Sequence, residues 1–169
     1  MPRAPRIEYP GATFHIQARG NRGEAIFVDR EESLRFLSIF EEVCADHNWD
    51  AFAWVLMPDH YQLTVRTNEA TLAKGMKHLN GHYAQWVNRK RRIDGHLFEG
   101  RYTAVVVDAA AWLPALVRLS ALAPVRAGLA GKAEKWRGGP YRYLGESGAK
   151  KPPTHLAAGG GLALLEADP

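Results

Sequence analysis

Three histidines stand where their spacing could support metal chemistry. His60 opens the segment His60–Arg66, which alternates between apolar and polar residues as a β-strand does. Its imidazole could bind a divalent cation or form an ordinary hydrogen bond on the polar face of that strand. His78 and His82 are four residues apart, the spacing of a metal-binding pair on a helix, but no third ligand lies nearby in the sequence. A metal site and plain polar histidines therefore both stay open.

A second group of residues suits the binding of phosphate. Arg19, Asn21 and Arg22 are interleaved with Gly20 and Gly23 in a short turn-forming segment. Such a loop can present guanidinium and backbone N–H groups to phosphates. The alternative is a solvated turn with no ligand.

Charge is distributed unevenly along the chain. The net charge is +4, with an isoelectric point near 9.3. Residues 31–59 carry seven acids and one arginine, whereas residues 70–104 carry two acids and seven bases, which are Lys74, Lys77, Arg89, Lys90, Arg91, Arg92 and Arg101. This segregation allows one basic face that could hold a phosphate backbone. A solvated helix end is the alternative for residues 89–92. The rings of Trp86, Phe98 or Tyr102 could stack on unpaired bases, although Trp86 has the spacing of a core residue.

The elements that must position these residues follow from hydrophobic periodicity. We expect the order strand, helix, strand, strand, helix, strand, helix, at residues 13–18, from 29 onward, 51–57, 60–66, 71–88, 101–107 and 112–122. The acids lie on the outer face of the first helix. Pro114 begins or kinks the last helix, and Ala123-Pro124 marks its exit. This order predicts an α+β, ferredoxin-like (split βαβ) antiparallel sheet covered by helices.

Composition places the chain among ordinary globular proteins. It has 169 residues, of which 46% are hydrophobic, with no run of eighteen apolar residues and no signal peptide at its start. We therefore expect a cytoplasmic protein without a membrane span. Cys44 is the single cysteine and is expected to be a buried thiol. Residues 1–145 are expected to form one domain, while the Gly, Ala and Pro-rich residues 146–169 form a loosely attached tail.

Four motifs occur in a characteristic order: RGN at residues 19–21, LMPDH at 56–60, GHLFEGRY at 95–102 and PVRAGL at 124–129. With them, residues 6–145 resemble the single-tyrosine HUH transposases, in particular the REP-associated tyrosine transposases of the IS200-like group. The resemblance implies a ferredoxin-like domain that binds hairpin-forming single-stranded DNA. Active members also cut and rejoin that DNA.

The resemblance also implies a definite catalytic site. In that family two histidines at i and i+2, together with a polar side chain from a later helix, hold a divalent cation, and a tyrosine of that helix attacks the phosphate. His60 matches the first histidine, but Gln62 occupies the second position. Leu119 and Ala123 stand where the tyrosine and the helix-borne ligand belong. No cofactor is therefore expected, and Mg²⁺ or Mn²⁺ would bind at His60 only if the altered site still accepts a metal.

The main hypothesis is therefore a transposase-like protein that binds hairpin or single-stranded DNA and no longer cleaves it. One alternative is an active metal-dependent enzyme with relocated catalytic residues, for which Tyr83 and Tyr102 are weaker candidates. Another is a ferredoxin-like RNA-binding or structural module. A monomer and a homodimer are both compatible with the sequence. The expected DNA contacts are Arg19, Asn21, Arg22, Lys74, Lys77, Arg89, Lys90, Arg91, Arg92, Arg101 and Tyr102.

Overall fold

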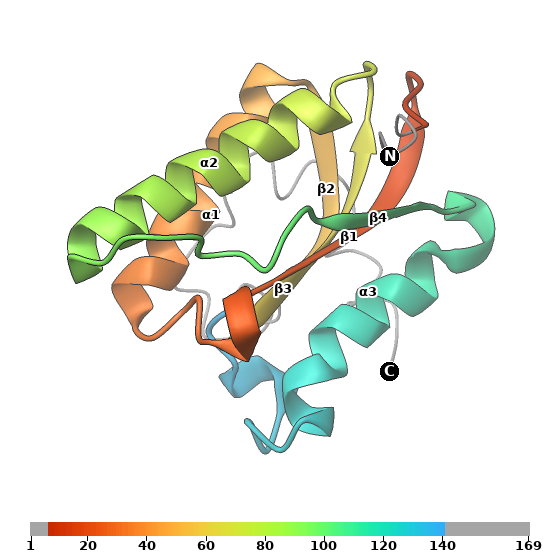
Figure 1. Cartoon of the computed structure of the whole chain (residues 1–169). Coiled ribbons are helices and arrows are strands. Elements are labelled where there is room, and N and C mark those ends of the chain that lie inside the picture. The colour runs from red at the N-terminus through yellow and green to blue at the C-terminus, as the bar shows by residue number, and fades with distance from the viewer. Residues whose placement is uncertain (1–6, 141–169) are drawn as a thin grey trace.

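The chain folds around a four-stranded antiparallel sheet, seen here in a computed structural model that describes residues 7–140. The strands are β1 (Ala12–Arg19), β2 (Trp49–Met57), β3 (His60–Thr67) and β4 (Thr103–Val106), in the sheet order β2-β3-β1-β4. The helices are α1 (Arg30–Asp46), α2 (Leu72–Arg91) and α3 (Ala109–Arg126), with short 3₁₀ turns at Asn21–Gly23 and Ala133–Lys135. Helices α1 and α2 cover one face of the sheet, and α3 covers the other (Figure 1). The predicted α+β, ferredoxin-like fold is confirmed.

Local signals explain where the elements begin and end. The carboxylate of Asp29 accepts a hydrogen bond from the backbone N–H of Glu32 at 2.9 Å and so caps α1. Pro58 and Asp59 connect β2 to β3, with Met57 paired to His60. Helix α2 ends where Arg92 adopts a left-handed conformation, with φ of 54°.

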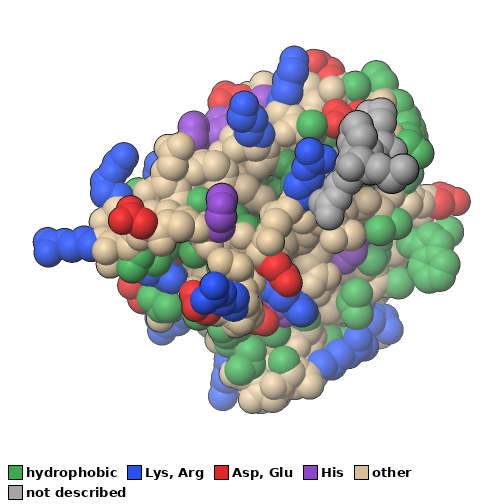
Figure 2. Space-filling model, viewed as in Figure 1, with side chains coloured by type: hydrophobic (Ala, Val, Ile, Leu, Met, Phe, Trp, Pro, Cys, Tyr) green, Lys and Arg blue, Asp and Glu red, His purple; other side chains and the backbone are tan. Residues whose placement is uncertain are grey.

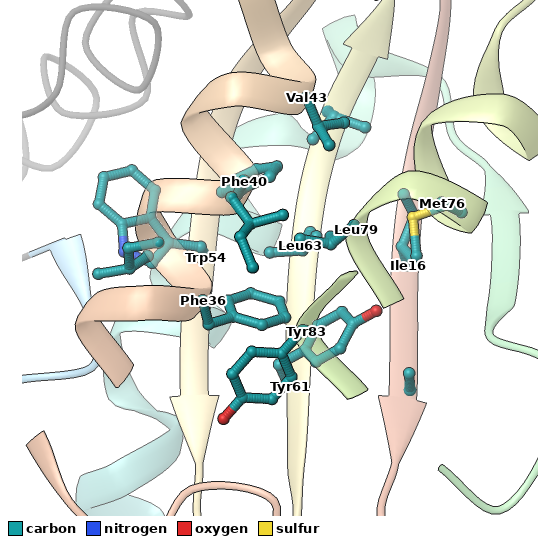
Figure 3. Close-up of a cluster of buried hydrophobic side chains, with 14 of the residues drawn as sticks. Ile16, Phe36, Phe40, Val43, Trp54, Tyr61, Leu63, Met76, Leu79 and Tyr83 are labelled. Atoms are coloured by element: carbon teal, nitrogen blue, oxygen red, sulfur yellow. The ribbon is translucent and has the colours of Figure 1, made fainter. Parts of the chain in front are cut away.

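The main core lies between the sheet and helices α1 and α2 (Figure 3). Alternate residues of β1 and β3 point into it because side chains alternate across a strand. The rings of Phe36, Tyr61 and Tyr83 pack together, with centroids 4.6 Å apart for Phe36 and Tyr61 and 5.1 Å apart for Phe36 and Tyr83. Cys44 is buried at the edge of this core as a free thiol, as expected.

The opposite face of the sheet has a smaller apolar contact with α3. It is built from Ala53, Val117 and Ala121, with Leu113 partly buried beside them. Buried polar side chains lie on the same side, including Thr64 of β3 and Ser120 of α3. The sheet is therefore strongly apolar on one face and mixed on the other.

The last helix differs from its prediction at both ends. It begins at Ala109, where the Asp108 carboxylate accepts from the N–H of Ala110 at 3.0 Å. It also continues through Pro124 to Arg126, so the predicted exit at Ala123-Pro124 is wrong. A proline ring removes one helical N–H, but Pro124 is buried. This packing offsets the lost hydrogen bond. Local sequence rules alone do not show that Pro124 is buried.

Glu32 also departs from its prediction. The acidic residues are expected on the outer face of α1, yet the Glu32 side chain is 0% exposed. Its carboxylate accepts from the N–H of Val28 at 2.8 Å and pairs with Arg91.

No helix within residues 7–140 is long and apolar enough to span a membrane. The predicted tail at residues 146–169 lies outside the described residues.

Candidate nucleic-acid interface

His60 and Gln62 point toward the α3 side of the sheet. Their neighbours Tyr61 and Leu63 point into the main core, so the strand's alternation places His60 and Gln62 on the opposite face. The Nδ1 atom of His60 lies 2.7 Å from Oδ1 of Asp59. Partial burial raises the pKa of Asp59, but the hydrogen bond and charge of His60, together with the nearby Arg19, outweigh it and leave the pKa below its usual value. This contact therefore orients the imidazole.

The residues that stand where the resemblance places the tyrosine and the helix-borne ligand carry no nucleophile or metal-binding group. Leu119 of α3 is 39% exposed at the margin of the contact with the sheet, and Ala123 is half-buried. The Oε1 atom of Gln62 is buried without a hydrogen-bond partner among the described residues. One imidazole and one amide oxygen provide no carboxylate to replace the water around Mg²⁺. This donor set therefore does not fit a resident divalent cation.

The histidine pair on α2 is also unlike a metal site. The rings of His78 and His82 have centroids 4.4 Å apart, and His47 is 5.7 Å from His78. Burial and the two neighbouring imidazoles lower the pKa of His78. Across residues 7–140, no three His, Cys, Asp or Glu side chains are placed to hold a metal ion.

Two of the described tyrosines are held inside the core. The hydroxyl of Tyr83 donates to the carbonyl of Ile26 at 2.6 Å, and that of Tyr61 donates to Oδ1 of Asn80 at 2.6 Å. Burial raises the pKa of both phenols well above the usual value. Tyr102 is partly buried against the same core. These environments favour packing over nucleophilic attack.

Arg19 and Arg101 line one depression beside His60. This sheet-end hollow has a volume of about 420 Å³, and Gln17, Arg19, Glu99, Arg101 and Thr103 are among its lining residues. The strand register pairs Arg19 with His60 and Gln17 with Gln62. The two arginines therefore lie at the end of the sheet face that carries His60 and Gln62.

The exposed bases of α2 form a second positive region. Lys74, Lys77, Arg89 and Arg92, which we call the basic strip, are all solvent-exposed. Figure 2 shows lysine and arginine side chains spaced along the α2 side of the molecule. Such a row of cations is suited to a phosphate backbone.

Lys90 and Arg91 use their charges within the protein. The Nζ atom of Lys90 lies 2.6 Å from Oδ2 of Asp29 and 3.0 Å from Oε2 of Glu31. Arg91 binds both oxygens of the buried Glu32 through Nε and Nη2, at 2.9 and 2.6 Å. These pairs join the end of α2 to the start of α1, so the two side chains are less available for phosphate than the basic strip.

The loop after β1 folds tightly against the chain that follows α2. The N–H of Asn21 donates to the carbonyl of Leu97 at 2.9 Å. A Cβ on Gly20 would lie 2.1 Å from the carbonyl oxygen of Glu24, so the turn requires glycine there. Asn21 and Arg22 line a hollow of about 290 Å³ together with Asn88, Arg91 and Asp94, among others.

Sequence reasoning missed Gln17 and Thr103, which share the sheet-end hollow with Arg19 and Arg101. Alternation along β1 places Gln17 and Arg19 on one face, so that part could have been found. Thr103 lies in the hollow because it pairs with Gln17 across the sheet. That register was not visible in the sequence.

Comparisons with known proteins agree with this architecture. A model of the transposase IS200-like family matches residues 9–115. The structure of a REP-associated tyrosine transposase bound to a REP hairpin is similar, with a TM-score of 0.70 and 16% identity over 94% of this chain and 97% of that chain. A proposed transposase from Deinococcus radiodurans gives a TM-score of 0.49 and 17% identity over 71% of this chain and 98% of that chain. A search of curated proteins found no match.

The fold and the family match thus define a protein of the single-tyrosine transposase class. Because the family model covers well over half of its length, the chain belongs to the IS200-like transposase family.

Proposed function

We propose that this protein binds hairpin or single-stranded DNA and does not cleave it. The proposal is supported by Gln62, Leu119 and Ala123, which stand where the resemblance places the second histidine, the tyrosine and the helix-borne ligand, on a fold that keeps its exposed bases. Leucine offers no nucleophile and alanine no lone pair for a cation. The similar REP-associated transposase is bound to a REP hairpin, which supports hairpin DNA as the ligand. The protein would then act on cellular DNA in the cytoplasm.

Two regions are proposed to hold the DNA. Arg19 and Arg101 would contact phosphates near the altered catalytic site, and the basic strip would contact the backbone along α2. Asn21 and Arg22 lie on the loop after β1, and Tyr102 follows Arg101 directly. Lys90 and Arg91 are expected to contribute less because of their ion pairs with Asp29 and Glu32.

The test is incubation of the purified protein with a labelled DNA hairpin that has a single-stranded flank, in the presence of Mg²⁺ or Mn²⁺. We expect salt-sensitive retention of the hairpin and no covalent product. A covalent protein–DNA product would show instead that the protein is an active transposase with relocated residues. If salt-sensitive binding to DNA is absent, the RNA-binding or structural alternative is favoured.

Paired variants test where the phosphates lie. The double variant Lys74→Ala, Lys77→Ala should weaken binding and make the negative slope of log K against log salt concentration shallower, by about 0.7–0.9 for each phosphate that the variant no longer neutralises. Arg35→Ala is the control for loss of a cation outside the basic strip, since it removes one charge from α1, where Arg35 lies 3.8 Å from Glu42. Equal slopes for the wild type and the double variant would show that the basic strip does not contact the DNA.

A further inference from the structure

Two glycines of α2 have opposite environments. A Cβ on Gly75 would lie 2.2 Å from Cζ2 of Trp49, so packing requires glycine at that position. A Cβ on Gly81 would meet no atom within 4 Å. Glycine is the least favourable residue in a helix interior apart from proline. Gly81 therefore weakens α2 without any packing need inside the protein.

Gly81 forms part of a depression that runs along the middle of α2. The chain between α2 and β4 returns beside α2 before it enters the sheet (Figure 1). The depression between them, which we call the α2 hollow, has a volume of about 440 Å³, within the range of ligand pockets. Its lining includes Asn80, Gly81, Ala84, His96, Phe98 and Glu99. A side chain on Gly81 would occupy space in this hollow.

We propose that the α2 hollow holds one unpaired nucleobase of the bound DNA. The inference rests on the proposed function, because it concerns how that DNA is recognised. The missing side chain at Gly81 lets a flat ring approach the helix backbone closely. Phe98 and His96 supply aromatic rings at the other wall, and stacking on such rings holds unpaired bases without requiring a particular sequence.

The polar groups of the hollow suit a base edge better than a phosphate. Oδ1 of Asn80 accepts from the hydroxyl of Tyr61 at 2.6 Å, which fixes the amide. Within residues 7–140 the Nδ2 group of Asn80 donates no hydrogen bond, so it can donate to a base. Glu99 adds a carboxylate that repels phosphate but accepts from an exocyclic amino group.

The position of the hollow also fits a bound DNA strand. Lys77 precedes Gly81 by four residues and Gln85 follows it by four, so all three share one side of the helix. Lys77 belongs to the basic strip, so a backbone held there would bring a base within reach of the hollow. Asn21, a proposed DNA contact on the loop after β1, also lines the hollow. The hollow therefore adjoins that loop as well.

The experiment compares two hairpins of the same stem, one with a single-stranded extension and one blunt and fully paired. Gly81→Leu should lower affinity for the extended hairpin about tenfold and leave the blunt hairpin within twofold. Gly81→Ala should lower affinity for the extended hairpin less, while its Tm rises by about 2–4 °C because alanine is a better helix former. Ser38→Leu is the matched control, because it adds the same side chain at an exposed site of α1.

The outcomes separate the two proposals. If Gly81→Leu leaves both affinities unchanged while the wild type binds both hairpins, the α2 hollow does not hold a base and DNA binding stands. If the wild type binds neither hairpin, the proposed function fails and this inference fails with it. Equal losses for both hairpins would show that Gly81 serves duplex contacts, which also overturns the inference.

Discussion

The two faces of the sheet are built for different purposes. The face under α1 and α2 is a continuous apolar core whose aromatic rings pack edge to face and tilted against one another. The face under α3 has a small apolar contact and carries Gln62 and Ser120, whose Oε1 and Oγ atoms are buried without partners among the described residues. Such atoms are not confined to this face, since Oγ1 of Thr67 on the other side of β3 is another. A buried polar atom without a hydrogen bond costs about 1–3 kcal/mol.

This difference separates the layer that stabilises the fold from the face that carries the histidine motif. The α1 and α2 layer, with its aromatic core and the Glu32–Arg91 pair, stabilises the fold. The α3 face carries His60 and Gln62 at the positions of the family's catalytic motif.

The largest expected effect is a loss of stability, and it should be greater in the core under α1 and α2 than under α3. Phe36→Ala should lower the free energy of unfolding by about 3–5 kcal/mol, because Phe36 is fully buried among aromatic rings. Val117→Ala, its counterpart under α3, should cost about 1.5 kcal/mol. Urea unfolding followed by far-UV circular dichroism measures both. Equal losses would contradict the view that stability is concentrated under α1 and α2.

The second-largest effect on stability is expected at the Glu32–Arg91 ion pair, which lies in the α1 and α2 layer. Arg91→Ala should destabilise the protein by about 3 kcal/mol, because the buried Glu32 carboxylate loses its two-point partner and keeps only Lys90, whose Nζ lies 3.7 Å from Oε1. Arg89→Ala, two residues earlier at an exposed position, is the control and should change stability by less than about 0.5 kcal/mol. Similar unfolding midpoints for the two variants would show that the pair is not structural.

A stabilising substitution is expected on the α3 face. Ser120→Ala removes a buried hydroxyl that has no partner among the described residues, so the free energy of unfolding should rise by about 1 kcal/mol. Differential scanning calorimetry of the variant and the wild type checks this. A lower Tm would mean that the hydroxyl is satisfied in solution and that the α3 face is better packed than we infer.

The smallest effect is a pH dependence at His15, whose Nδ1 lies 3.1 Å from Oγ1 of Thr64. Burial lowers the pKa of His15, so the folded state takes up its proton at a lower pH than the unfolded chain does. Stability should therefore fall as the pH drops below about 6.5 and until the folded pKa is passed. His15→Asn should reduce this fall between pH 7 and pH 5, as measured by urea midpoints. His96→Asn, at an exposed histidine, should leave the fall unchanged.

Much of the fold was predictable because local patterns coincide with the tertiary structure. The alternating residues of β1 and β3, the Pro58-Asp59 turn and the apolar stripe of α2 all indicate their elements directly. The last helix was harder, because Pro124 is compensated by burial that only packing supplies. The burial of Glu32 was missed for a similar reason, since its partner Arg91 is 59 residues away.

The order of the elements, the charge segregation and the identity of the residues that match the family's motifs could all be predicted from the chain alone, because these depend on residue type and short-range spacing. Which of the bases pair with carboxylates depended instead on how the helices pack. Lys90 and Arg91 resemble Arg89 and Arg92 along the chain, yet the approach of α1 pairs two of the four with carboxylates. Contacts between residues distant in sequence depend on how helices pack, and no local pattern records them.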